Sequence, residues 1–101
     1  MTELTAVELD LLAGTSEECG EVVQVIGKIL RHGLESYKPS DPLKITNRQK
    51  LTEELADISC LIDMLFENGV IDMTWWVLLK QQKRERFLKY TKVPLDEFKT
   101  P

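Results

Sequence analysis

The strongest constraint on the fold is an apolar repeat between residues 51 and 65. Aliphatic residues recur there at intervals of four, three, four and three: Leu51, Leu55, Ile58, Ile62 and Leu65. This spacing places all five side chains on one face of an α-helix. Either Thr46 with Gln49, in a capping box, or Asn47 alone caps a helix before the repeat, and Asn68-Gly69 follows it. The sequence therefore predicts a helix that begins after Thr46, ends at Asn68-Gly69 and buries one face.

A second helix is expected in the first third of the chain. Thr5 and Glu8 have the form of a capping box, which predicts a helix start near residue 5. An apolar stripe with 3-4-3 spacing follows, made of Cys19, Val22, Ile26 and Ile29. Gly33 suits the position just beyond a helix end. Gly14-Thr15-Ser16 interrupts the apolar pattern, and Thr15 with Glu18 offers a second capping box, so the sequence leaves open whether the helix breaks there.

The rest of the chain predicts a loop, a third helix and a polar tail. Residues 34–46 contain Pro39 and Pro42 and form a loop that is long enough to cover a site. Asp72 can cap a helix that runs to about Tyr90, and the tail from about residue 92 is expected to be loosely ordered. Since no segment has a strand pattern, we expect an all-α fold. It would be an antiparallel bundle of three to four helices in a single domain over residues 1–101.

Length and composition favour a cytoplasmic globular protein. The chain has 101 residues, of which 43% are hydrophobic and 30% charged. The net charge of -4 gives no general attraction to a nucleic-acid polymer or an anionic membrane. One histidine and two widely spaced cysteines, Cys19 and Cys60, match no usual zinc pattern, so we expect both cysteines to be small buried residues. Because long helices in so short a chain have few partners, we expect a homo-oligomer to complete the core.

Two acidic pairs carry the most specific chemistry. Glu18 with Glu21, and Glu54 with Asp57, are each three residues apart, so each pair lies on one face of its helix. Packed antiparallel, the two helices would gather four carboxylates, which repel one another unless a cation lies between them. Mg²⁺ prefers such oxygen ligands. The alternative is that each pair belongs to a solvated helix face.

Basic residues near these helices are candidates for binding phosphate. Lys28 lies on the same stripe as Glu18 and Glu21, about 10 Å further along the helix axis than Glu21. Arg31 follows one turn later, and the third helix carries Lys83 and Arg84. Each of these is also typical of a solvated face. Trp75 and Trp76 suit either a base-stacking role or a core or oligomer interface.

The acidic residues also carry a family resemblance. Glu17-Glu18-x-x-Glu21 followed by Glu54-x-x-Asp57 resembles the signature of the MazG-like all-α nucleoside triphosphate pyrophosphatase superfamily. The similarity continues through Lys28-Ile29-Leu30-Arg31-His32-Gly33, and resumes at Asn47-Arg48 and from Leu51 to Ile58. It covers both central helices, about half of the chain, and weakens over residues 66–101.

The resemblance implies an enzyme that hydrolyses nucleoside triphosphates to monophosphate and pyrophosphate. It implies Mg²⁺, with Mn²⁺ as an alternative metal, and a homodimer or dimer of dimers. By position, the metal ligands would be Glu18, Glu21, Glu54 and Asp57. Glu17 would be a further ligand or orient the attacking water, and Lys28 would bind phosphate. Two alternatives stay open: a phosphoribosyl-ATP pyrophosphatase-like enzyme, and a non-catalytic helical interaction or regulatory module.

Overall fold

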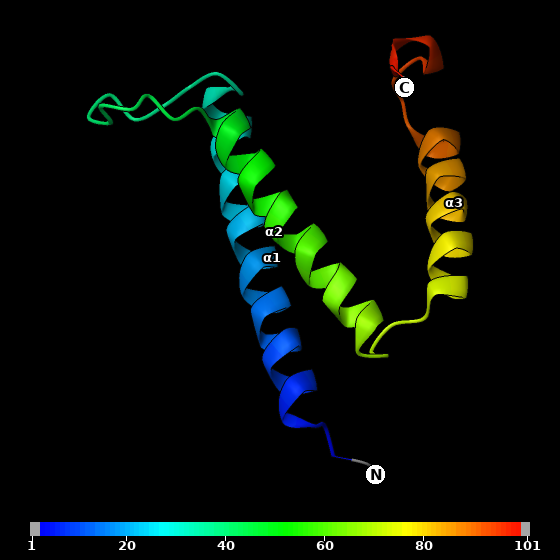
Figure 1. The fold of residues 1–101 in the computed structure, drawn as a ribbon. Coiled ribbons are helices and arrows are strands. Elements are labelled where there is room, and N and C mark those ends of the chain that lie inside the picture. Colours follow the sequence, from blue (N-terminus) through cyan, green and yellow to red (C-terminus); the bar gives the residue numbers. More distant parts are fainter. Residues whose placement is uncertain (1–2, 100–101) are drawn as a thin grey trace. The chain divides into compact units, whose positions relative to one another are not determined.

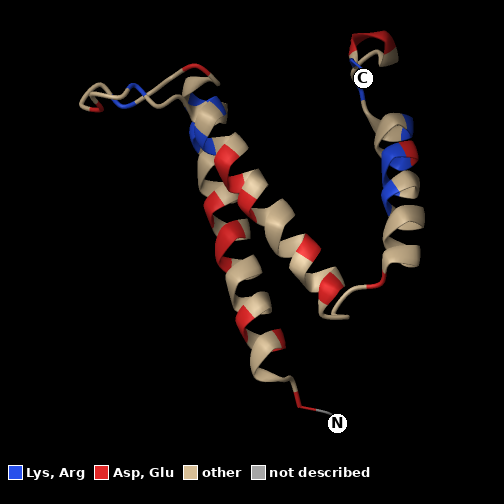
Figure 2. Cartoon of the chain, viewed as in Figure 1, with Lys and Arg blue, Asp and Glu red and all other residues tan. Residues whose placement is uncertain are grey.

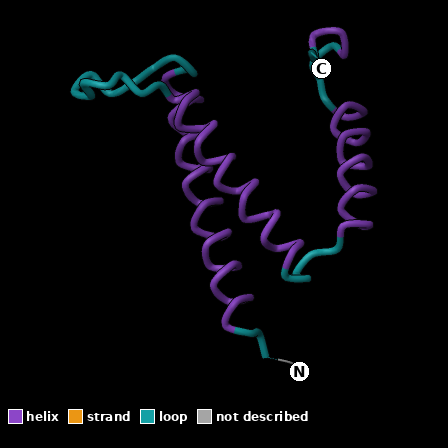
Figure 3. The backbone as a smooth tube through the Cα atoms, in the orientation of Figure 1, coloured by secondary structure: helices purple, strands orange, loops and turns teal. Residues whose placement is uncertain are grey.

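A computed structural model describes residues 3–99, and all of the regular structure in that range is helical. The elements are α1 (Ala6–His32), α2 (Asn47–Glu67), α3 (Met73–Tyr90) and a short 3₁₀ helix, η1 (Leu95–Glu97). Figures 1 and 3 show them in chain order, with no strand in the described range. The fold is therefore all-α, as predicted. No helix within residues 3–99 is both long and apolar enough to cross a membrane.

The chain divides into two compact units at the junction between Val70 and Ile71. The first unit contains α1 and α2, which run antiparallel and pack against each other (Figure 1). The second contains α3 and η1. Each unit has its own local order, and the candidate metal ligands all come from the first unit.

Local capping interactions explain where α1 begins, and the helix continues past the interruption in its apolar pattern. The Thr5 hydroxyl accepts a hydrogen bond from the Glu8 backbone N–H at 3.1 Å, and the Glu8 carboxylate accepts one from the Thr5 N–H at 2.8 Å. This reciprocal capping box confirms the predicted start. The helix then runs unbroken through Gly14-Thr15-Ser16, and the Thr15 hydroxyl donates to the Leu11 carbonyl at 2.7 Å. Thr15 thus bonds within the helix and does not cap a new one.

The other helix ends also follow local sequence signals. Gly33 ends α1 with a φ of 91°, a conformation that favours glycine, and its N–H donates to the Ile29 carbonyl at 2.7 Å. Thr46 and Gln49 form the predicted capping box at the start of α2. At the start of α3, the Asp72 carboxylate accepts a hydrogen bond from the Trp75 N–H at 2.8 Å. These boundaries were all predicted.

The face that α1 turns towards α2 matches the predicted one only in part. Leu11 and Val25 are buried, and Val22 and Ile29 of the predicted stripe are half-buried, whereas Cys19 and Ile26, also expected in the core, are exposed. Cys60 on α2 is also exposed, so the prediction of two buried cysteines was wrong for the single chain. The physical reason is that Leu11 and Val25 are separated by 14 residues, about four turns, and Glu18 lies midway on the same stripe. The helix buries the stripe that carries its carboxylates.

The predicted seam of α2 is partly correct. Leu65 is buried, and Leu51, Ile58 and Ile62 are half-buried, but Leu55 is 47% exposed. The half-buried positions of α2 also include Glu54. The seam is therefore rotated towards the acidic residue, in agreement with the rotation seen in α1.

The loop between the two helices is closed at its base by Asn47, a buried polar residue. The Asn47 side-chain amide donates to the Gly33 carbonyl at 3.1 Å, and its backbone N–H donates to the Ser36 carbonyl at 2.9 Å. Further out, the Asp41 carboxylate accepts hydrogen bonds from the N–H groups of Ile45 and Leu43, which lower the pKa of Asp41. The loop is thus a folded segment held at both its base and its tip.

The second unit is small and mostly exposed. The ring of Phe98 packs edge to face against Phe87, with 6.1 Å between the ring centroids. Phe98 and Leu88 are half-buried, whereas Trp75 is 61% exposed. The segment after residue 91, predicted to be a loose tail, contains η1 in the described range.

Candidate metal centre

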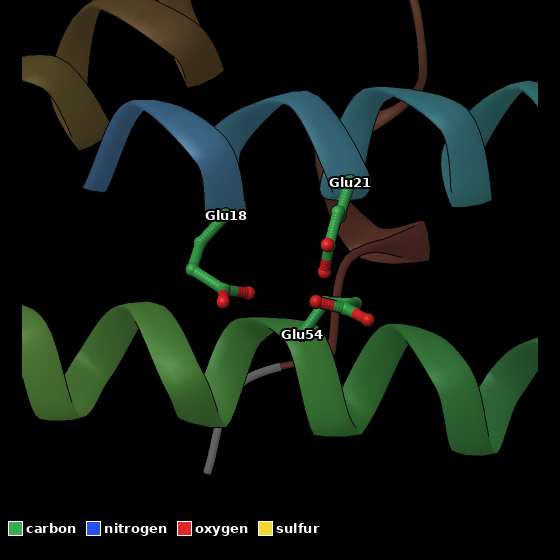
Figure 4. A group of neighbouring side chains, drawn as sticks. All are labelled: Glu18, Glu21 and Glu54. Atoms are coloured by element: carbon green, nitrogen blue, oxygen red, sulfur yellow. The ribbon is translucent and has the colours of Figure 1, made fainter. Parts of the chain in front are cut away.

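Three carboxylates from two helices converge at the middle of the α1–α2 interface. Glu18 and Glu21 reach down from adjacent turns of α1, and Glu54 reaches up from α2 to meet them (Figure 4). One oxygen of each carboxylate lies within 4.8 Å of an oxygen of each of the other two. These are three of the four ligands predicted from the sequence, and the convergence depends on the antiparallel packing of the two helices.

The carboxylates are partly removed from water. All three side chains are half-buried, and while the carboxylates are ionised the Oε2 atoms of Glu18 and Glu54 are buried without a hydrogen-bond partner among residues 3–99. Buried polar atoms in folded proteins are normally hydrogen-bonded, because leaving one unpaired has an energetic cost. Two such oxygens on facing carboxylates are the donor set that a hard cation prefers.

The electrostatics of the cluster favour a proton or a cation between the side chains. Hydrogen bonding to the Glu21 and Glu18 carboxyls, together with desolvation and their negative charge, raises the pKa of Glu54 from 4.5 to about 7. Two carboxylates share a hydrogen bond only when one of them holds a proton. Near neutral pH, therefore, Glu54 is protonated in part of the metal-free molecules, and a bound cation would replace that proton.

Glu17 and Asp57, the two other predicted acidic residues, lie outside this group. Both side chains are exposed, and neither belongs to the set of oxygens that lie within 4.8 Å of one another. Asp57 follows Glu54 by one turn of α2, and Glu17 precedes Glu18 directly. Their assignment as ligands or water-orienting groups remains a prediction.

Two of the predicted phosphate-binding residues line a pocket beyond the carboxylates. Lys28 and Arg31 border a cavity of about 420 Å³ at the C-terminal end of α1. Figure 2 shows the basic residues of α1 gathered at this end, beyond its acidic residues. The full lining consists of Lys28, Arg31, His32, Ser36, Tyr37, Lys38, Pro39 and Asn47.

The remaining predicted substrate residues belong to the second unit. Lys83 and Arg84 are exposed on α3. Arg84 borders a hollow along the helix, next to Trp76, Val77, Lys80 and Gln81. Their role in binding remains a prediction.

Two loop residues in the pocket, Tyr37 and Lys38, were not identified from the sequence. They lie in a segment without periodicity, and no motif of the sequence points to them. Two features of the sequence were relevant to this pocket. The loop is long enough to cover a site, and Asn47 was predicted only as a possible helix cap.

Comparison of the chain with protein-family models, with curated proteins and with solved structures finds no match.

Proposed function

We propose that this protein is a Mg²⁺-dependent nucleoside triphosphate pyrophosphohydrolase, which releases a nucleoside monophosphate and pyrophosphate. The observation that carries the proposal is the convergence of Glu18, Glu21 and Glu54, with two buried oxygens that have no partner in the described chain. The resemblance of the acidic pattern to the MazG-like superfamily supports it. A cationic pocket on the same helix supports it further, because triphosphates are polyanions.

The donor set fits Mg²⁺ better than a softer metal. All three converging ligands are carboxylate oxygens, which suit magnesium, calcium and manganese, and neither cysteine is among them. Glu18, Glu21 and Glu54 would hold the ion, and Asp57 would complete the set. When bound, Mg²⁺ supplies charge neutralisation for the triphosphate and lowers the pKa of a coordinated water.

The protein's own residues would then position the reactants. Water adds across the anhydride between the α- and β-phosphates: its hydroxyl joins the α-phosphorus, and the bridging oxygen leaves with pyrophosphate. The attacking water gives up one proton, which an exposed carboxylate such as Glu17 can accept and pass to solvent. Lys28 and Arg31 would bind phosphate oxygens and stabilise the charge on the leaving group. The reaction needs no nucleophilic side chain.

A homodimer belongs to the same proposal. The outward face of α1 carries four exposed aliphatic residues at intervals typical of a helix–helix contact: Leu12, Val23, Ile26 and Leu30. Within residues 3–99 the buried hydrophobic residues of the single chain are few: Leu11, Val25 and Leu65. A second copy packed on this face would bury apolar surface that the described chain leaves open.

The direct test is an assay of pyrophosphate release from a panel of ribo- and deoxyribonucleoside triphosphates, with Mg²⁺ and with EDTA. We expect metal-dependent release from at least one nucleotide, and loss of it in Glu21→Gln. The matched control is Glu53→Gln, a neighbouring exposed carboxylate of α2 outside the cluster, which should retain activity. Absence of release from every nucleotide, by folded protein that binds Mg²⁺, would overturn the proposed function.

A further inference from the structure

The pocket at the C-terminal end of α1 has a cationic lining drawn from two different segments. The basic residues Lys28 and Arg31 come from α1, and Lys38 comes from the loop. No aspartate or glutamate of the described part of the chain is among the lining residues. Three basic side chains without an acidic one in the lining favour an anionic ligand.

The loop residues are held in place, so the pocket is built by the fold. Asn47 is only 6% exposed, and it ties the loop to the end of α1 through the Gly33 and Ser36 carbonyls. The Arg48 N–H donates to the Leu34 carbonyl at 2.8 Å, and the Arg48 guanidinium pairs with Glu35. The Glu35 carboxylate therefore has its own cationic partner, and neither Glu35 nor Asp41 is among the residues that line the pocket.

The basic residues of the pocket lie at a distance from the carboxylates that one triphosphate can span. Lys28 lies two turns beyond Glu21 on α1, about 10 Å along the axis, and Arg31 lies nearly one turn further. A phosphate held at the carboxylates would therefore have the rest of its chain within reach of these flexible basic side chains. Tyr37 and Lys38 line the same pocket, and a tyrosine hydroxyl and a lysine ammonium can both donate hydrogen bonds to phosphate oxygens.

We propose that this pocket binds the diphosphate end of the substrate, the part that leaves as pyrophosphate, and that Lys38 of the loop is a further phosphate-binding residue. The identity of the anion rests on the proposed function; the cationic pocket itself does not. The pocket then sets the direction of the substrate, with the nucleoside on the carboxylate side and the terminal phosphate at the loop.

The experiment is calorimetric titration of inorganic pyrophosphate, of a nucleoside triphosphate and of the uncharged nucleoside into the full chain in EDTA, where hydrolysis is suppressed. We expect pyrophosphate and the triphosphate to bind. We expect Lys38→Met to weaken both by about tenfold, since one charge-assisted contact is lost. Lys44→Met is the matched control, because Lys44 has the same charge in the same loop and does not line the pocket.

The outcomes separate this inference from the proposed function. The inference is supported if Lys38→Met weakens binding of pyrophosphate and triphosphate, Lys44→Met does not, and the same difference is seen in the Glu21→Gln/Glu54→Gln background. This result supports the pocket even if the protein hydrolyses no nucleotide. Equal binding by Lys38→Met and wild type overturns the inference and leaves the carboxylate site untouched. Binding of the nucleoside that is lost in Lys38→Met also overturns it, because the pocket would then hold the base. If Lys38→Met weakens the binding of pyrophosphate but not of the triphosphate, the assignment of the pocket to the diphosphate end of the substrate is overturned.

Discussion

Glu18 and Glu54 face each other across the α1–α2 interface, and each has one buried oxygen without a hydrogen-bond partner in the described chain. The two residues are 36 positions apart in sequence and belong to different helices. Packing the two helices against each other therefore brings like charges close together, and separating the helices would move these charges apart. The interface is stable at neutral pH only to the extent that a proton, water or a cation offsets this repulsion.

Mg²⁺ should raise the melting temperature of the protein. A ligand that binds only the folded state stabilises it by about 2.7 kcal/mol at 100 times its dissociation constant. Thermal melting across a Mg²⁺ titration measures this shift. In Glu54→Gln, which keeps the shape and removes the charge, the shift should largely disappear. A wild-type midpoint that does not respond to Mg²⁺ or Mn²⁺ would rule out the site.

Without metal, stability should fall as the pH rises through the titration of Glu54. The pKa of Glu54 is raised from 4.5 to about 7 in the folded chain. A raised pKa means that the folded state binds the proton more tightly than the unfolded state. The resulting stabilisation is full below pH 4.5 and is lost as the pH reaches about 7. Urea unfolding in EDTA at several pH values should show this decline, and Glu54→Gln should remove it.

Glu21→Gln should lower kcat/KM by a factor of about 100 or more while the helical content stays unchanged, because it removes one converging ligand. Asp57→Asn should also lose most activity if Asp57 completes the metal site in the working enzyme. Steady-state kinetics and circular dichroism measure both effects. Activity near the wild-type level in Asp57→Asn would restrict the ligands to the three carboxylates that converge.

Gly14→Ala should stabilise the protein. Gly14 lies inside α1, where glycine is less favourable than alanine by about 1 kcal/mol. A Cβ at Gly14 would lie 3.8 Å from Leu61 Cδ1, an ordinary van der Waals contact. The melting temperature should rise by roughly 4–8 °C per kcal/mol gained. Gly33→Ala is the control that should lower the melting temperature, because the φ of 91° at Gly33 disfavours any side chain.

Val23→Lys should weaken self-association. Val23 is 70% exposed on the outward face of α1, and a charge at the centre of an apolar contact between two copies would be desolvated. Sedimentation at micromolar concentration should show a dimer for the wild type and a shift towards monomer for the variant. Leu43→Lys, at a loop position that is 78% exposed, should sediment like the wild type. A monomeric wild type would contradict the dimer proposal.

The helix boundaries could be predicted because capping is local. Thr5, Thr46, Asp72 and Gly33 act on backbone groups within about four residues, so a short stretch of sequence contains the full interaction. Continuity through Gly14 was open in the sequence, because the Thr15 hydroxyl has two alternative partners. The hydrogen bond to the Leu11 carbonyl decides between them.

The buried face of each helix was harder to predict, because it depends on the partner helix. Cys19 and Ile26 have the spacing of a core stripe, yet the neighbouring stripe with Leu11 and Val25 is the buried one. Hydrophobicity alone could not choose between two stripes when the buried one also carries glutamates. The acidic pattern did predict the meeting of Glu18 with Glu54, since a cation site needs both helices. The same argument predicted Asp57 as a fourth ligand, but Asp57 does not belong to the group of converging carboxylates.

The closed base of the loop affects which insertions the sequence can accept during evolution. Because Asn47 and Arg48 bond back to Gly33, Ser36 and Leu34, the two helices are joined by a short connection that does not depend on the tip. Doubling the length of a flexible loop costs only about 0.6 kcal/mol in closure entropy. Insertions beyond Lys38 would therefore leave the helical pair intact, and new recognition elements can be added at the tip without rebuilding the acidic centre.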